Sequence, residues 1–168
     1  MLGNSVWARV VGVDRRTVIE GVEFDEAAEV VVVAVRRRRP GKQRCGLCGR
    51  VAGGYDQGGG RRRWRALDLG VVRVELEADA PRVSCRVHGV VVAEVPWERH
   101  GAGHTRAFDD TVAWLVTQAS KSATSELLRV SWRTVGSIVD RVVADLDRHI
   151  DRFDHWPAQP ERVRHLTK

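Results

Sequence analysis

The chain has 168 residues, of which 43% are hydrophobic and 30% charged, and its net charge is +6. This length holds one ordinary domain or two small ones, and the hydrophobic fraction is enough for a core. No apolar run approaches the roughly 20 residues of a membrane span, and charged residues interrupt the first twenty positions, so the sequence predicts a cytoplasmic protein with no membrane partner.

The amino-terminal residues 1–27 are poorly patterned. We expect a strand near Trp7 to Val13 and a turn at Phe24 to Glu26. The run from Val30 to Val35 is short and rich in β-branched residues, which predicts a buried strand rather than a helix.

Positive charge is concentrated in residues 36–65, which hold eleven Lys and Arg against Asp56 alone. A block this basic predicts a polyanionic partner, because each neutralised phosphate releases counterions and favours binding. A solvated charge run is the alternative. Within the block, the candidate DNA contacts follow the glycine-rich stretch: Arg61, Arg62, Arg63 and Arg65.

Two short clusters, Cys45-Gly-Leu-Cys48 and Cys85-Arg-Val-His88, have metal-ligand spacing. Tetrahedral zinc takes thiolate and imidazole ligands, and a two-residue spacer lets one tight turn direct both side chains of a cluster at the same ion. Four protein ligands leave no position for water, so the pattern predicts a structural Zn²⁺ rather than a catalytic one. A redox Cys-x-x-Cys and cysteines that are merely buried are the alternatives.

Short strands are expected around these clusters. Residues 53–60 are mostly glycine and predict a mobile loop. A strand is expected at Trp64 to Leu67, a half-buried strand where apolar and charged residues alternate from Val72 to Ala78, and another at Val90 to Val95. The strands and both clusters together predict a zinc-ribbon-like β module over residues 28–96.

Residues 97–104 read as a linker, in which His100 and His104 are expected at the surface, with metal ligation as the alternative. The apolar period then becomes helical, which predicts an all-α domain over residues 105–146 and an α+β fold class for the chain. Thr105, Ser122 and Ser131 are placed to cap three successive helices. The first helix carries apolar residues at three- and four-residue spacing: Phe108, Val112, Leu115, Val116 and Ala119.

The second of these helices is short and carries Leu127 and Leu128, and the third has an apolar stripe at Val135, Ile138, Val139 and Val142. A short helix, a tight turn and an amphipathic helix with a polar first turn predict a helix-turn-helix that binds double-stranded DNA. Arg133, Thr134 and Ser137 are the candidates for base or phosphate contact, and Arg141 for the DNA backbone. An ordinary helical bundle shows the same apolar spacing and is the alternative.

Several motifs also carry a family resemblance: Cys45-Gly-Leu-Cys-Gly, Tyr55-Asp-Gln-Gly-Gly-Gly-Arg-Arg-Arg-Trp-Arg-Ala-Leu-Asp-Leu-Gly, Cys85-x-x-His-Gly, Val95-Pro-Trp-x-Arg-His and His104-Thr-Arg-Ala-Phe-Asp-Asp. From about residue 28 to 145, the chain resembles the amino-terminal part of the ISL-three family of bacterial insertion-sequence transposases. The resemblance implies zinc at Cys45, Cys48, Cys85 and His88, and a helix-turn-helix that recognises the terminal inverted repeats of the element.

Members of that family continue into an RNase-H-like catalytic domain, whereas residues 147–168 read as a polar tail. Asp151, Asp154 and His155 are carboxylate and imidazole groups without the partners that two-metal chemistry needs. We therefore expect DNA binding by a truncated transposase without catalysis, with a homodimer or a full-length transposase as further partners. A zinc-dependent protein-interaction or transcription-regulator module is the alternative function.

Overall fold

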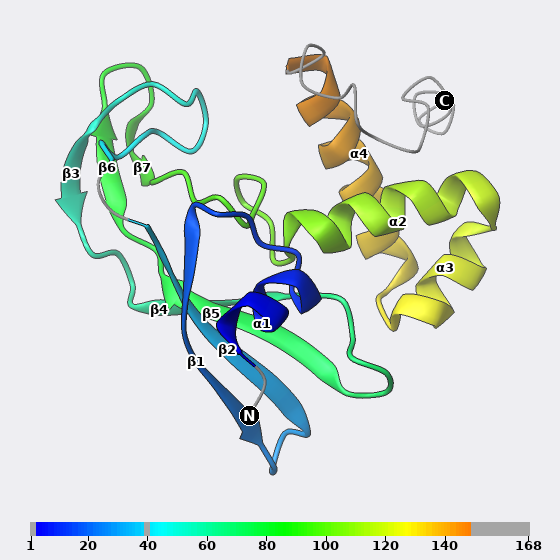
Figure 1. The fold of residues 1–168 in the computed structure, drawn as a ribbon. Coiled ribbons are helices and arrows are strands. Elements are labelled where there is room, and N and C mark those ends of the chain that lie inside the picture. Colours follow the sequence, from blue (N-terminus) through cyan, green and yellow to red (C-terminus); the bar gives the residue numbers. More distant parts are fainter. Residues whose placement is uncertain (1–2, 39–40, 149–168) are drawn as a thin grey trace. The chain divides into compact units, whose positions relative to one another are not determined.

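The computed structural model describes residues 3–38 and 41–148, which form parts of two compact units, Met1–Ala107 and Phe108–Lys168 (Figure 1). The first unit contains α1 (Asn4–Val10), β1 (Thr17–Asp25), β2 (Val30–Arg37), β3 (Gly53–Asp56), β4 (Arg61–Arg65), β5 (Arg73–Asp79), β6 (Arg82–Cys85) and β7 (Gly89–Val92). The helices α2 (Arg106–Gln118), α3 (Lys121–Leu128) and α4 (Trp132–Arg148) follow. The predicted α+β class, a β module followed by a helical bundle, is confirmed.

The larger sheet of the first unit has the strand order β1-β2-β5-β4. β2 pairs antiparallel with β1 and parallel with β5, and β4 closes the other edge antiparallel to β5 (Figure 1). In β5 the buried residues Val74, Leu76 and Ala78 alternate with charged residues, as predicted, and every apolar residue of β2 is buried or half-buried. Val33, Trp64, Val74 and Leu76 are fully buried in its core, and each such side chain contributes about 1.5–3 kcal/mol.

The smaller sheet has the order β3-β6-β7 and carries both predicted metal clusters. β6 and β7 form a hairpin whose closing pair is Cys85 and Gly89, so the second cluster is the hairpin turn itself. The isolated bridge between Arg44 and Val51 closes the turn that holds the first cluster, and Cys45 itself forms a second bridge with Ala93. Strands far apart in sequence therefore bring the two clusters to one end of this sheet.

Three local predictions are wrong. The stretch around Trp7 is helix α1 rather than a strand, and Trp7 and Val10 pack against the sheet core. Phe24 and Asp25 still belong to β1, so the turn falls at residues 26–29 instead. Gly53–Asp56 is strand β3 rather than loop, because the edge of β6 supplies hydrogen-bonding partners for its backbone.

Candidate functional site

The first cluster is a tight turn held by backbone hydrogen bonds. The N–H of Cys45 donates to the carbonyl of Arg50 at 2.9 Å, and the N–H of Gly49 donates to the carbonyl of Cys45 at 2.8 Å. Gly49, directly after Cys48, has a φ of +68°, and Gly89, directly after His88, has a φ of +67°. Both turns thus leave the metal cluster through a left-handed residue, which glycine adopts without steric cost.

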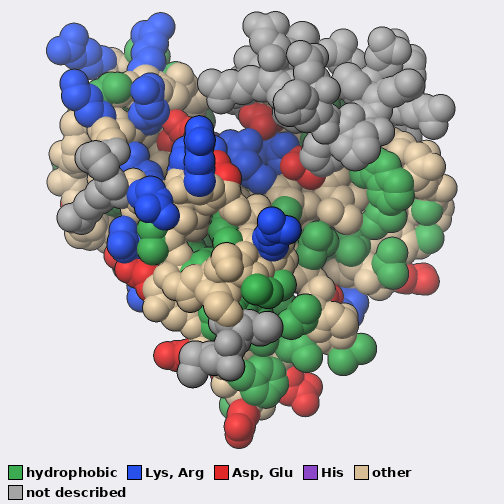
Figure 2. All heavy atoms as spheres, viewed as in Figure 1, with side chains coloured by type: hydrophobic (Ala, Val, Ile, Leu, Met, Phe, Trp, Pro, Cys, Tyr) green, Lys and Arg blue, Asp and Glu red, His purple; other side chains and the backbone are tan. Residues whose placement is uncertain are grey.

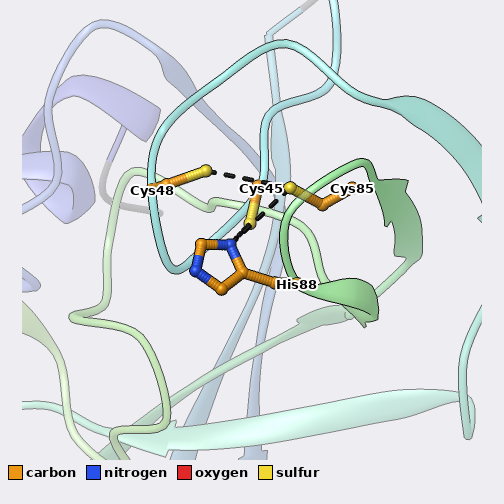
Figure 3. Close-up of side chains that lie close together, drawn as sticks. All are labelled: Cys45, Cys48, Cys85 and His88. Atoms are coloured by element: carbon orange, nitrogen blue, oxygen red, sulfur yellow. Dashed lines mark hydrogen bonds between the residues drawn. The ribbon is translucent and has the colours of Figure 1, made fainter.

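The four side chains of the two turns point at one another (Figure 3). Their donor atoms all lie within 4.8 Å of one another. The Sγ atoms of Cys48 and Cys85 are 3.8 Å apart, and the Nδ1 of His88 lies 3.6 Å from the Sγ of Cys45 and 3.7 Å from that of Cys85. Tetrahedral zinc bonds of about 2.3 Å to sulfur and 2.0–2.1 Å to nitrogen require ligand separations of about 3.8 and 3.6 Å.

The cluster therefore fits Zn²⁺, with His88 binding through Nδ1. A disulfide between Cys48 and Cys85 is excluded, because it needs its sulfur atoms at about 2.05 Å. Among residues 3–38 and 41–148, this is the one group of three or more Cys, His, Asp and Glu side chains arranged for a metal, and neither His100 nor His104 belongs to it.

The two buried thiols of the cluster have different proton affinities. Backbone N–H groups of Val87 and His88 lower the pKa of the Cys85 thiol from 9.0 to about 6, whereas burial raises the pKa of Cys45. The backbone N–H groups thus favour the thiolate form of Cys85 that binds metal, whereas burial favours the protonated form of Cys45, whose proton metal binding must displace. Acid competes with the metal for these ligands.

The second unit contains a short helix, a turn and a long helix. The Ser120 hydroxyl accepts from the N–H of Ala123 at 3.1 Å and caps α3, which corrects the prediction of Ser122. Arg129 ends α3 in the left-handed conformation, with a φ of 53° and ψ of 45°. The Ser131 hydroxyl then accepts from the N–H of Thr134 at 3.1 Å, as expected for the cap of α4.

Helix α4 has one buried and one exposed face. Its predicted apolar stripe is buried throughout: Val135, Ile138, Val139 and Val142. Arg133 and Ser137 lie on the exposed face, as does Asp140. A helix with this division, preceded by a short helix and a three-residue turn, has the geometry of a recognition helix.

Comparisons with known proteins match both halves of this arrangement. Residues 41–88 match the zinc-finger of transposase IS204/IS1001/IS1096/IS1165, and residues 93–143 match the helix-turn-helix domain of transposase family ISL3. This chain carries the zinc-finger and helix-turn-helix domains of the ISL3 transposase family. Its zinc is structural, because the ISL3 zinc-finger match covers all four ligands and these fill a tetrahedral site.

Relatives of this ISL3 chain are transposases. The chain is 57% identical over 148 residues to the transposase for insertion sequence element IS1557 in two strains of Mycobacterium tuberculosis, CDC 1551 / Oshkosh and H37Rv. The match covers 86% of this chain and 33% of each relative, so the chain spans about a third of the length of these proteins. No solved structure matches it.

Two of the predicted contact residues on α4 form contacts within the chain. The Thr134 hydroxyl lies 2.7 Å from that of Ser131, inside the helix cap. Arg141 is half-buried and pairs with the carboxylate of Asp109 on α2 at 3.1 Å, where the Asp109 side chain is fully buried. Arg141 therefore holds α4 to α2, and Arg133 and Ser137 are left as the exposed candidates.

Replacing Arg141 with alanine is expected to destabilise the helical unit by about 2 kcal/mol, because the buried carboxylate of Asp109 loses its charged partner. Arg133→Ala is the matched control: it removes an exposed arginine from the same helix and is expected to change stability by less than about 0.5 kcal/mol. Urea denaturation followed by far-ultraviolet circular dichroism measures both. Equal stability of the two variants would contradict the assignment.

The four arginines of β4 are also engaged within the ISL3 zinc-finger unit. Arg61 and Arg63 pair across the sheet with Glu77 at 3.1 and 2.9 Å, and Arg65 pairs with Asp68 at 3.2 Å. Arg62 lies over the ring of Trp64, 5.1 Å from its centroid. The structure thus places these side chains in intramolecular contacts rather than leaving them as a free basic strip.

The sequence did not single out Trp132, an exposed residue of the helix-turn-helix. Trp132, the first residue of α4, is 60% exposed, and the ammonium group of Lys121 lies 5.3 Å from the centroid of one of its rings. Its sequence signal was a large aromatic directly after the capping serine. Within the part of the chain that the structure describes, no helix is long and apolar enough to cross a membrane.

Proposed function

We propose that the chain binds double-stranded DNA sequence-specifically and recognises the terminal inverted repeats of an insertion sequence. The observation that carries the proposal is the exposed face of α4: Arg133 and Ser137 stand opposite the buried stripe, directly after the capped turn from α3. Arginine binds the O6 and N7 atoms of guanine through two parallel hydrogen bonds, and a serine hydroxyl binds any base edge. Helix α4 is accordingly the element that enters the major groove.

In this proposal the zinc holds the fold of the small sheet of the first unit and takes no part in chemistry, because its ligands leave no open position. The chain binds DNA without cutting it and acts in the cytoplasm, where its target DNA lies. A second copy of the chain or a full-length transposase at the same repeat is its further partner. Asp151, Asp154 and His155, which the sequence does not assign to a metal site, lie outside the described residues.

Footprinting on the ends of the insertion sequence tests the proposal. Zinc-loaded protein is expected to protect the terminal inverted repeats and to leave flanking DNA open to nuclease. The same complex incubated with Mg²⁺ or Mn²⁺ is expected to release no cleaved strand. Uniform protection along the fragment would refute site-specific binding, and metal-dependent nicking at the repeat ends would refute the absence of catalysis.

A second candidate function is protein binding by the helical unit. Large apolar side chains are exposed on its surface: Trp114 by 40%, Leu127 by 66% and Trp132 by 60%. Exposed aromatic residues are enriched in protein interfaces. Pull-down and light scattering separate this function from the first, since a stable protein complex without DNA affinity would favour it.

A further inference from the structure

A second group of basic residues in the first unit differs from the arginines of β4. Lys42, Arg44, Arg50 and Arg86 are all exposed, and within residues 3–38 and 41–148 none of them forms an ion pair with a carboxylate. Each lies within three residues of a zinc ligand. These four exposed cations therefore lie on or next to the metal turns.

The geometry brings Arg44, Arg50 and Arg86 to one end of the small sheet, and Lys42 precedes the first turn in sequence. Arg44 and Arg50 belong to the same turn, because Arg44 forms a bridge with Val51 and its guanidinium donates to the carbonyl of Gly49 at 2.8 Å. Arg86 lies on the other turn, directly after Cys85, whose Sγ is 3.8 Å from that of Cys48. Figure 2 shows Lys and Arg side chains gathered over the end of the unit where Figure 1 places β3, β6 and β7.

Nearby negative charge is smaller than this positive charge. Zinc with three thiolates and a neutral imidazole has a net charge of about −1. The Asp56 carboxylate accepts hydrogen bonds from Nε and Nη2 of Arg82, so the charge of Asp56 is already neutralised. Glu94, whose N–H donates to the carbonyl of Arg44 at 2.8 Å, is a further acid beside the turns. Four cations therefore leave the end of the sheet positive.

We propose that Lys42, Arg44, Arg50 and Arg86 form a second DNA-binding surface that contacts backbone phosphates, and that zinc assembles it by joining the two turns. The proposal rests on the DNA-binding function proposed above. This surface contributes affinity and salt dependence to DNA binding. Helix α4 discriminates between sequences, because phosphate contacts carry no base information. These four residues take the phosphate-binding role that the sequence predicted for the arginines of β4.

Two double variants with equal loss of charge test the proposal. Arg50→Gln with Arg86→Gln should lower the slope of log K against log salt by about 1.8, since each phosphate contact contributes about 0.9. The same variant should weaken binding to repeat and scrambled DNA by the same factor, about 30-fold near 0.15 M salt. Arg61→Gln with Arg63→Gln, the matched control, should leave the slope unchanged. Zinc content and melting temperature are measured for each protein.

Two further variants guard against misfolding. Arg50→Lys with Arg86→Lys keeps both charges and should retain the wild-type slope, and Lys42→Gln, outside both turns, should lower the slope by about 0.9. The proposal would be overturned if the two double Gln variants had equal salt slopes. It would also be overturned if Arg50→Gln with Arg86→Gln lowered the preference for repeat over scrambled DNA. Wild-type protein that binds no DNA would instead refute the proposed function itself.

Discussion

Removing zinc is expected to unfold the small sheet of β3, β6 and β7 while the larger sheet persists. The buried core of the small sheet consists of Cys45, Val83, Cys85 and Ala93, so two of its four buried residues are zinc ligands. Structural zinc contributes about 10 kcal/mol or more to folding at neutral pH. A core of this size cannot replace that contribution.

Hydrogen exchange with and without chelator measures this effect strand by strand. Chelation should abolish the protection of amides in β6 and β7. The internal control is the larger sheet, whose separate core includes Val33, Trp64 and Leu76 and should keep β2 and β5 protected. Unchanged protection in β6 and β7 after verified loss of zinc would show that the metal does not hold the fold.

Replacing Arg133 with alanine is expected to cost most of one base-specific contact. An arginine that binds guanine through two hydrogen bonds contributes about 1–3 kcal/mol of discrimination, which corresponds to roughly 5- to 150-fold in affinity. Arg133 is exposed on α4 and the helix does not depend on it, so its loss should lower affinity for the repeat far more than for scrambled DNA. Ser137→Ala should lower the same ratio by a smaller factor.

Arg133→Lys is the control that separates charge from base recognition. Lysine keeps the positive charge but loses the planar, two-pronged donor geometry. It should bind scrambled DNA as tightly as the wild type, with an unchanged salt slope, while selectivity for the repeat falls. Full selectivity of the alanine variant would remove Arg133 from the recognition surface.

The sequence predicted the metal site and the helical unit well, because each is marked by short motifs with a characteristic residue spacing. Ligand spacing placed Cys45 and His88 in one cluster, and apolar spacing placed Ile138 on the buried face of α4. Arg129 shows the limit of this approach, since a non-glycine residue ends α3 in a left-handed conformation. Here the helices on either side of the turn impose the backbone geometry.

The roles of the arginines could not be predicted, because they depend on long-range strand pairing. Arg63 stands directly opposite Glu77 only because β4 and β5 pair in one register. In the sequence the same arginine belongs to a basic run with no acid nearby. The Asp109 partner of Arg141 likewise comes from another helix. Charge runs therefore predicted a polyanion partner but could not show which arginines form ion pairs within the chain.

Strand β3 and helix α1 were missed for related reasons. Gly53 and Gly54 have little intrinsic strand preference, and the edge of β6 supplies the pairing that orders them. Around Trp7, β-branched valines suggested a strand, whereas packing of Trp7 and Val10 on the larger sheet favours a helix. In both places tertiary contacts outweigh local propensity.

The most direct test of DNA recognition is an equilibrium anisotropy titration of the zinc-loaded chain at about 0.15 M salt. One labelled duplex carries a terminal inverted repeat of the insertion sequence, and the other has the same composition in scrambled order. A sequence-specific helix-turn-helix predicts binding to the repeat at least about 10³-fold tighter than to the scrambled duplex. Equal affinity for the two duplexes would contradict it.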